Sequence, residues 1–383
     1  MSFDEPVLRI AAVGFAVALG VSLLAVPLCL RLARICGIMD KPGGRKTHET
    51  VTPLLGGMGV VLGAMAGLAV VWMKSEAELP AGLGFSDIGF VIAGSLVIFV
   101  IGLVDDIFKD SMGFEPKLLG QIVGVLVLML PTLRDLVSGG GTVDQWLYQL
   151  FFLGWYLTIV NSFNFSDNMN GLMSGLSVIS FAAAIMYLSN TDSFRSMTVA
   201  VVLLAAVLGF MPYNFPRSKV FLGDTGSMFI GFWMAWVQFD LVKGFMAVSS
   251  HDFGASHLIP AVLIMGVPLY DAAFVVFMRI VDKRPVYLGD CYHLSHRLVR
   301  GGFSNSEAVV ILWGLALILA WLGILASKTQ AGYRYMILGA SFLFMIAVTR
   351  KIISMERLAP PTDDADAPSS SEVAGPNGAH SAS

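Results

Sequence analysis

Long apolar segments alternate with short polar segments along most of the chain. A helix needs about 20 mainly apolar residues to cross the hydrocarbon core of a bilayer, and eleven segments approach that length, or ten if one of the shorter ones does not cross. They lie at 7–30, 54–73, 88–104, 118–133, 146–160, 171–189, 196–212, 226–242, 258–280, 308–326 and 332–349. The pattern predicts an all-α, polytopic integral membrane protein.

The composition agrees with this pattern. Of the 383 residues, 56% are hydrophobic and only 13% are charged, whereas a soluble domain is about a quarter charged because it covers itself with polar surface. The chain has no basic stripe of the kind that binds nucleic acid. Residues 1–350 are expected to form one membrane domain, and residues 351–383, rich in Pro, Ser, Ala and Asp, a disordered cytoplasmic tail.

The distribution of Lys and Arg predicts which ends of the helices face the cytoplasm. The loops at 31–53, 105–117, 161–170, 213–225 and 279–307, together with the tail, hold 17 of the 24 Lys and Arg residues. Cytoplasmic loops carry the excess of basic residues in most membrane proteins. We therefore expect the N-terminus outside, the C-terminus in the cytoplasm, and the protein in the inner (plasma) membrane.

Acidic and amide side chains gather in the same basic loops. Asp105 and Asp106 end one apolar segment, where two adjacent carboxylates favour a nearby cation. Asn161, Asn164 and Asp167 are spaced by three and would share one face of a helical turn, where their oxygens suit a hard cation such as Mg²⁺ or a phosphate-sugar ligand. Each motif also has a plain interpretation, as a solvated helix end or a helix cap.

Three further motifs lie on this side of the predicted membrane. Asp224 stands between Gly223 and Gly226, at a position that could cap the next helix. His293, His296 and Arg297 form one basic cluster, and Lys46 and His48 belong to another. Such clusters either contact phosphate or only fix the topology. Together, three acidic positions and two basic clusters on one face predict a site for Mg²⁺ and a phosphorylated substrate.

In its motifs the chain resembles the polyprenyl-phosphate N-acetylhexosamine-1-phosphate transferases (glycosyltransferase family 4), the family of WecA, TagO and MraY. The resemblance covers roughly residues 10–350, lies closer to the WecA side, and rests on five blocks in the family's order. The blocks contain Asp40, Pro42, Arg45, Lys46 and His48; Asp105, Asp106 and Lys117; Asn161, Asn164 and Asp167; Phe221, Gly223, Asp224, Gly226 and Ser227; and Asp290, His293, His296 and Arg297.

The resemblance implies the transfer of N-acetylhexosamine-1-phosphate from a UDP-N-acetylhexosamine to polyprenyl phosphate. It implies Mg²⁺, with Mn²⁺ as an alternative, held by Asp224 with Asp106 or Asp167, while Asp105 orients or deprotonates the acceptor phosphate. The catalytic set is then Asp105, Asp106, Asp167 and Asp224. The substrate-binding set is Lys46, His48, Lys117, Asn161, Asn164, His293, His296 and Arg297. A homodimer is compatible with this interpretation.

Two positions depart from the family pattern, and two other interpretations stay open. Asn170 stands where the family has a second acid, and Ser295 stands where it has a histidine.

An ion-coupled transporter would place its ionisable residues near the membrane midplane, whereas the acids of this chain lie at helix ends. The other alternative is a non-catalytic scaffold of a cell-envelope complex.

Overall fold

Helices account for nearly all of the described structure. The computed structural model describes residues 5–40, 51–78, 88–108, 112–191, 193–247, 255–287 and 291–358. In these residues the first helices are α1 (Glu5–Cys36), α2 (Gly56–Glu78), α3 (Ile88–Ile107), α4 (Phe114–Gly139), α5 (Val143–Phe165), α6 (Leu172–Leu188), α7 (Phe194–Asn214) and α8 (Gly223–Ala247). After a short 3-10 helix, η1 (Ala255–His257), come α9 (Leu258–Ile264), α10 (Gly266–Val281), α11 (Leu294–Arg300), α12 (Asn305–Ser327) and α13 (Ala331–Leu358).

The helices confirm an all-α, polytopic membrane protein. Seven of them are long and apolar enough to cross a bilayer, and an eighth span results if α9 and α10 are counted together. This is fewer than the eleven predicted segments, partly because α6 has only 17 residues. α13 runs to Leu358, so the boundary predicted at residue 350 falls inside a helix. The rest of the predicted tail lies outside the described residues.

One predicted span, 258–280, is broken into two helices. α9 and α10 meet at an angle of 83° on either side of Met265. Pro268 causes this break, because it has no N–H to donate to the carbonyl of Ile264, four residues earlier. The Ser180 hydroxyl donates to that carbonyl at 3.1 Å. A side chain from α6 thus replaces the missing helical bond, as a helix break in an apolar environment requires.

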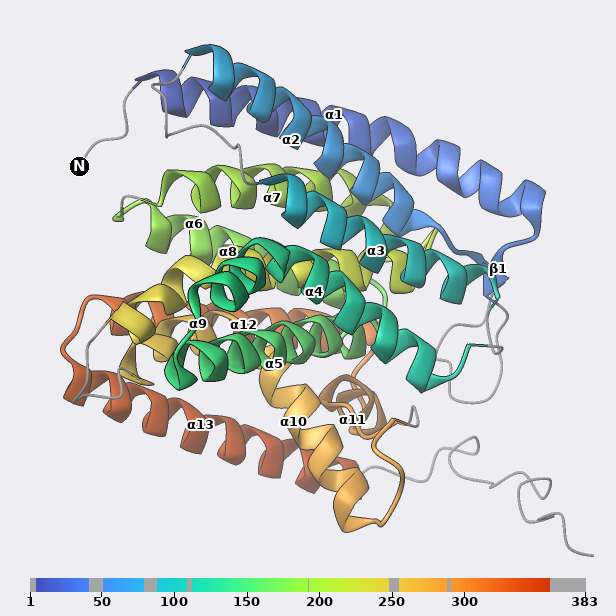
Figure 1. Ribbon diagram of the computed structural model, residues 1–383. Helices are drawn as coiled ribbons and strands as arrows, with labels where there is room; N and C mark the ends of the chain where they lie inside the picture. Colours follow the sequence, from blue (N-terminus) through green and yellow to red (C-terminus); the bar gives the residue numbers. More distant parts are fainter. Residues whose placement is uncertain are drawn as a thin grey trace, which may run out of the picture.

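α8 runs through the middle of the bundle. Its aromatic side chains Phe229, Phe232 and Trp233 are fully buried. α3 and α5 pack against it, and α2 and α7 approach it from another side, with α1 and α2 lying together at one edge of the bundle (Figure 1). Glycine allows the closest approach: a Cβ on Gly57 would lie 2.3 Å from the backbone nitrogen of Gly226. Small residues at helix crossings are how membrane helices gain packing contacts.

A short β-ribbon, absent from the sequence-based expectation, joins α1 to α2. β1 (Met39–Asp40) pairs antiparallel with β2 (Thr52–Pro53). The backbone after β2 is bonded to the segment before α8: Phe221 N–H donates to the Pro53 carbonyl, and Gly57 N–H donates to the Leu222 carbonyl, both at 2.9 Å. The predicted basic motif with Lys46 and His48 belongs to residues 41–50, which lie outside the described residues.

The Gly57–Gly226 crossing yields a prediction about stability. A Gly57→Ala substitution places a methyl group where α8 backbone now lies, so α2 has to move away from α8. We expect the free energy of unfolding to fall by about 1–3 kcal/mol, measured as a lower midpoint of thermal unfolding in detergent. Gly154→Ala is the matched control, because Gly154 is exposed on α5 and a Cβ there meets nothing within 4 Å. Equal midpoints for the two variants would contradict the packing argument.

Candidate active site

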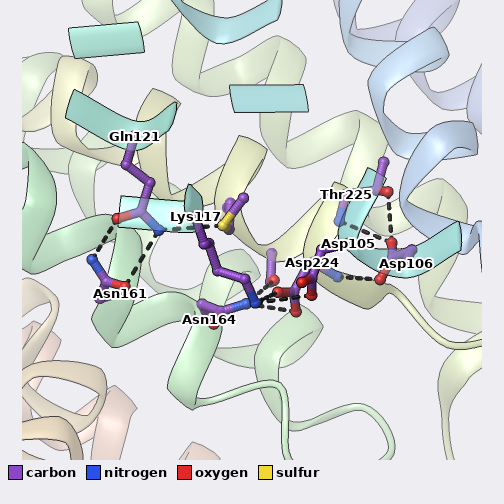
Figure 2. Close-up of polar contacts among 10 residues, drawn as sticks. Asp105, Asp106, Lys117, Gln121, Asn161, Asn164, Asp224 and Thr225 are labelled. Carbon is purple, nitrogen blue, oxygen red and sulfur yellow. Dashed lines mark hydrogen bonds and ion pairs between the residues drawn. The ribbon is translucent and has the colours of Figure 1, made fainter. Parts of the chain in front are cut away.

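Four helices bring one charged cluster together at the same end of the bundle. Asp105 lies near the end of α3, Lys117 in the first turn of α4, Asn164 near the end of α5 and Asp224 at the start of α8. Figure 2 shows their polar groups converging. The structure thus brings together four side chains that are far apart in the sequence.

Asp224 is the centre of this cluster. Its Oδ1 accepts a hydrogen bond from Asn164 Nδ2 at 2.9 Å, and its Oδ2 accepts one from the Lys117 ammonium. Asn164 Nδ2 also lies 3.0 Å from the hydroxyl of Ser227, one turn further along α8. Both carboxylate oxygens thus have a donor, which fixes the orientation of Asp224.

Lys117 joins the two acids. Its Nζ donates to Asp105 Oδ2 at 2.9 Å as well as to Asp224. Two carboxylates that share one ammonium repel each other less than they would alone, but the group of three still carries one net negative charge. The Asp105, Lys117 and Asp224 side chains are 20–23% exposed. A small cation or a phosphate oxygen can therefore reach them without unfolding.

Asp106 faces a different set of groups from Asp105. Its Oδ1 accepts from the Asp224 N–H at 2.9 Å, and its Oδ2 accepts from the Thr225 N–H at 3.0 Å and from the Thr225 hydroxyl at 2.6 Å. These donors belong to the first turn of α8, where helical N–H groups lack helical partners and the dipole favours a negative charge. Asp106, only 6% exposed, is thus an interhelical cap.

The junction before α8 has room for this cap only because residue 223 is glycine. Gly223 has a φ of 70°, in the left-handed region, and a Cβ on it would lie 2.5 Å from Asp106 Oδ2. The capping contacts hold Asp106 against the first turn of α8, beside Asp224, while its predicted catalytic and metal-ligand roles stay predictions. Adjacent residues of one helix point in different directions, which explains why Asp105 and Asp106 contact different groups.

Asn161 lies between two helices. It pairs with Gln121 of α4: Asn161 Nδ2 donates to Gln121 Oε1 at 2.8 Å, and Gln121 Nε2 donates back at 3.3 Å. Gln121 is fully buried. The two amides satisfy each other between α4 and α5, so these contacts give Asn161 a packing role, and its predicted substrate contact stays a prediction.

Asp167 lies in the turn that follows α5. Its backbone N–H donates to the Asn164 carbonyl at 3.1 Å, and its side chain is half-buried. The position is one turn beyond Asn164 on the same end of the bundle. Its predicted catalytic and metal-binding roles stay predictions.

A second group of buried polar residues surrounds His293. His293 Nδ1 lies 2.6 Å from Asp271 Oδ2, and the Leu294 N–H donates to Asp271 Oδ1 at 2.8 Å. The rings of His293 and His296 lie 6.0 Å apart. Asp271 was missed in the sequence, although a lone carboxylate inside an apolar span is a recognised signal of function.

Comparison with known proteins places these residues in a family. Residues 88–242, from the start of α3 into α8, match glycosyl transferase family 4. The chain is 32% identical over 351 residues to the decaprenyl-phosphate N-acetylglucosaminephosphotransferase of Mycobacterium leprae (strain TN), covering 85% of this chain and 84% of that protein. The chain belongs to glycosyl transferase family 4. This confirms the family resemblance found in the sequence motifs.

Other relatives cover similar lengths. The chain is 29% identical to the probable undecaprenyl-phosphate N-acetylglucosaminyl 1-phosphate transferase of Bacillus subtilis (strain 168), over 89% of this chain and 92% of that protein. It is 30% identical to the undecaprenyl-phosphate alpha-N-acetylglucosaminyl 1-phosphate transferase of Escherichia coli (strain K12), over 78% of this chain and 79% of that protein. The family-model match contains Asp105, Lys117, Asn164 and Asp224.

One departure of this family 4 member from the family motif has a structural explanation. Ser295, which replaces a family histidine, donates its hydroxyl to Asn168 Oδ1 at 2.7 Å. It thereby ties the start of α11 to the turn after α5. Nothing in the described structure assigns a role to Asn170.

Arg297 contacts protein groups on several sides. Its guanidinium donates to Glu356 Oε2 of α13 at 2.7 Å and to the Tyr292 carbonyl at 3.1 Å, and it lies 5.4 Å from the centre of the Phe274 ring. Glu356 also accepts from Arg300 at 2.6 Å. With 7% exposure, Arg297 joins α11 to α13, and its predicted substrate contact stays a prediction.

The capping role of Asp106 predicts that the two adjacent acids respond differently to truncation. Asp106→Ala leaves three buried donors of α8 without an acceptor, and each unsatisfied group costs about 1–3 kcal/mol. We expect a clear loss of thermal stability in detergent. Asp105→Ala removes a carboxylate that is 20% exposed and accepts a hydrogen bond from the solvent-accessible ammonium of Lys117, so its unfolding midpoint should stay near that of the unmodified protein. The cap assignment fails if both variants unfold at the same temperature.

Proposed function

We propose that this protein transfers N-acetylglucosamine-1-phosphate from a UDP-sugar to a polyprenyl phosphate, giving polyprenyl-diphosphate-sugar and UMP. Its relatives are named as undecaprenyl-phosphate N-acetylglucosaminyl 1-phosphate transferases and a decaprenyl-phosphate N-acetylglucosaminephosphotransferase. The observation that carries the proposal is the cluster of Asp105, Lys117, Asn164 and Asp224 at one end of an apolar helical bundle. There, phosphate chemistry and a membrane-embedded acceptor can meet.

The reaction joins two anions, so neutralising and aligning charge is the main task. The acceptor phosphate attacks the β-phosphorus of the UDP-sugar, and UMP leaves. A phosphate monoester has a second pKa of about 6, so the acceptor needs little help from a base. Asp105 would orient the acceptor, and Lys117 would neutralise charge on the diphosphate. Such preorganised electrostatic contacts carry most of the catalysis in phosphoryl transfer.

The cluster fits the Mg²⁺ that the family resemblance implies, with Mn²⁺ as the alternative. Mg²⁺ is usually held by one or two carboxylates together with water and substrate phosphates. Asp224 and Asp105 supply two carboxylates, whereas no set of three or more His, Cys, Asp or Glu side chains gathers as a metal site among the described residues. Asp224 would be the first ligand, and Asp167 stays a predicted further one. When bound, the ion would neutralise negative charge on the diphosphate.

We place the site on the cytoplasmic side of the inner (plasma) membrane. The loops at this end of the helices hold most of the Lys and Arg residues of the chain. The same rule puts the N-terminus outside and the C-terminus in the cytoplasm, with about eleven crossings. The acids lie at helix ends, which favours a headgroup-level transferase over an ion-coupled transporter. The reaction would be the first membrane step in the synthesis of a cell-envelope glycan.

The transferase proposal is tested with purified protein, polyprenyl phosphate, Mg²⁺ and a panel of UDP-N-acetylhexosamines. We expect UMP release with UDP-GlcNAc, its loss on addition of EDTA, and a fall of about 10²- to 10³-fold or more in Asp224→Asn, because that change removes a charge from the centre of the cluster. Asp135→Asn, at an exposed position of α4, should retain full activity. Absence of UMP release with every UDP-sugar would leave the scaffold as the better interpretation.

The bridging ammonium makes a separate prediction about metal binding. In Lys117→Met, Asp105 and Asp224 lose their shared cation, so a divalent ion should bind there more tightly before substrate arrives. We expect the dissociation constant for Mn²⁺, measured by electron paramagnetic resonance without substrate, to fall by about tenfold, or ~1.4 kcal/mol, while UMP release is lost. Lys74→Met, which removes a lysine paired with Glu78 of the same helix, is the matched control. Unchanged or weaker Mn²⁺ binding in Lys117→Met would contradict a metal site at these two acids.

A further inference from the structure

Asp271 is a buried carboxylate in a helix that is otherwise almost wholly apolar. It lies in the second turn of α10, is 6% exposed, and belongs to a segment whose composition is that of a membrane span. A carboxylate is costly in such a place and is normally paired or functional. Both of its oxygens have partners: Oδ2 lies 2.6 Å from His293 Nδ1, and Oδ1 accepts from the Leu294 N–H at 2.8 Å.

We infer that Asp271 is a positioning residue that acts through His293, by holding the proton on Nδ1 and leaving Nε2 for the anionic substrate. This inference rests on the proposed function and on the substrate-binding role that the family resemblance implies for His293. A carboxylate can only accept a hydrogen bond from an imidazole, so the ring must carry its hydrogen on Nδ1. The hydrogen bond made by one ring nitrogen decides whether the other ring nitrogen carries a proton.

The same carboxylate also fixes the start of α11. His293 is the residue that precedes this helix, and its own side chain makes no capping bond. Asp271 caps the helix from outside through the Leu294 N–H. The ring and the backbone of the His293 region are thus both held by one carboxylate, which leaves the histidine little freedom to turn away.

Contacts through Phe165 connect His293 to the charged cluster. The His293 ring packs edge-on against Phe165 with 6.2 Å between ring centres, and the guanidinium of Arg279 lies 5.3 Å from the centre of the same ring. The residue before Phe165 is Asn164, which donates to Asp224. His293 is therefore held next to the end of α5 that supplies the Asn164 contact, where a diphosphate on the acidic cluster would extend.

A purely structural role for Asp271 can be separated from a positioning role by one substitution. Asp271→Asn keeps an oxygen that can accept from the Leu294 N–H, so the helix cap can persist. Its amide nitrogen can only donate, so His293 Nδ1 must become an acceptor and the proton must move to Nε2. The variant therefore reverses the tautomer and spares the cap.

A double-mutant cycle in kcat/KM for UMP release tests the inference. We expect Asp271→Asn to lower kcat/KM by about 10- to 100-fold, the usual effect of losing the partner of a functional histidine, with an unfolding midpoint near that of the unmodified protein. In a His293→Ala background, Asp271→Asn should have no further effect. Equal losses in both backgrounds, or full activity of Asp271→Asn, would overturn the inference. Asp135→Asn, at an exposed position of α4, is the matched control with activity retained.

A second measurement does not depend on activity. The chain has six histidines, so the ¹⁵N spectrum of ¹⁵N-histidine-labelled protein can be assigned for His293 from the signals that disappear in His293→Ala. We expect the Nδ1-protonated pattern for His293 and its reversal in Asp271→Asn; an unchanged pattern would refute the pairing. If no UDP-sugar releases UMP, the proposed function fails, whereas the ¹⁵N result still reports whether Asp271 sets the tautomer.

Discussion

The site depends on holding two carboxylates close together at the edge of an apolar bundle. Asp105 and Asp224 come from different helices. Their carboxylates repel each other, and each would be better solvated in water. The ammonium of Lys117, which contacts both, makes the arrangement possible without substrate. Because one positive charge does not balance two negative ones, the cluster keeps an attraction for a further cation. A diphosphate accompanied by a divalent ion brings both the cation and an anionic partner for the ammonium.

The bundle around α8 keeps this cluster in place. Asp106 fixes the first turn of α8 through three hydrogen bonds, and the backbone at and after β2 is bonded to the segment just before α8. Gly57 and Gly226 let α2 approach closely from the other side. Asp224 therefore stands on a helix whose position is set by neighbours on several sides, with its carboxylate orientation set by Asn164 and Lys117. Electrostatic catalysis requires rigid support of this kind, because donors that must first reorganise stabilise the transition state less.

Much of the site could be predicted because its residues follow simple rules of position. Acids and amides at the ends of apolar segments must gather at the membrane surface, and the basic loops indicate one surface for all of them. The division of tasks between Asp105 and Asp106 could not be predicted, because it depends on where the N-terminus of α8, more than a hundred residues later, comes to lie. Asn161 and Asn164 are chemically identical, and only the presence of Gln121 on α4 assigns the first to packing. Arg297 likewise meets Glu356 of α13, a pairing that no local pattern indicates.

The broken helix shows how a feature that weakens a membrane span can serve the site. A continuous helix over 258–280 would keep one direction, whereas the bend of 83° at Met265 gives α10 a different direction, in which it contacts α5. Pro268 breaks the helical hydrogen bond and Ser180 compensates for it, so the bend needs no water in the apolar interior. Asp271 lies one turn after the break and can meet His293 because of that direction. Pro268 is unfavourable for the helix itself. The bend that it causes allows the buried carboxylate of Asp271 to reach His293, beside the end of α5 where the charged cluster begins.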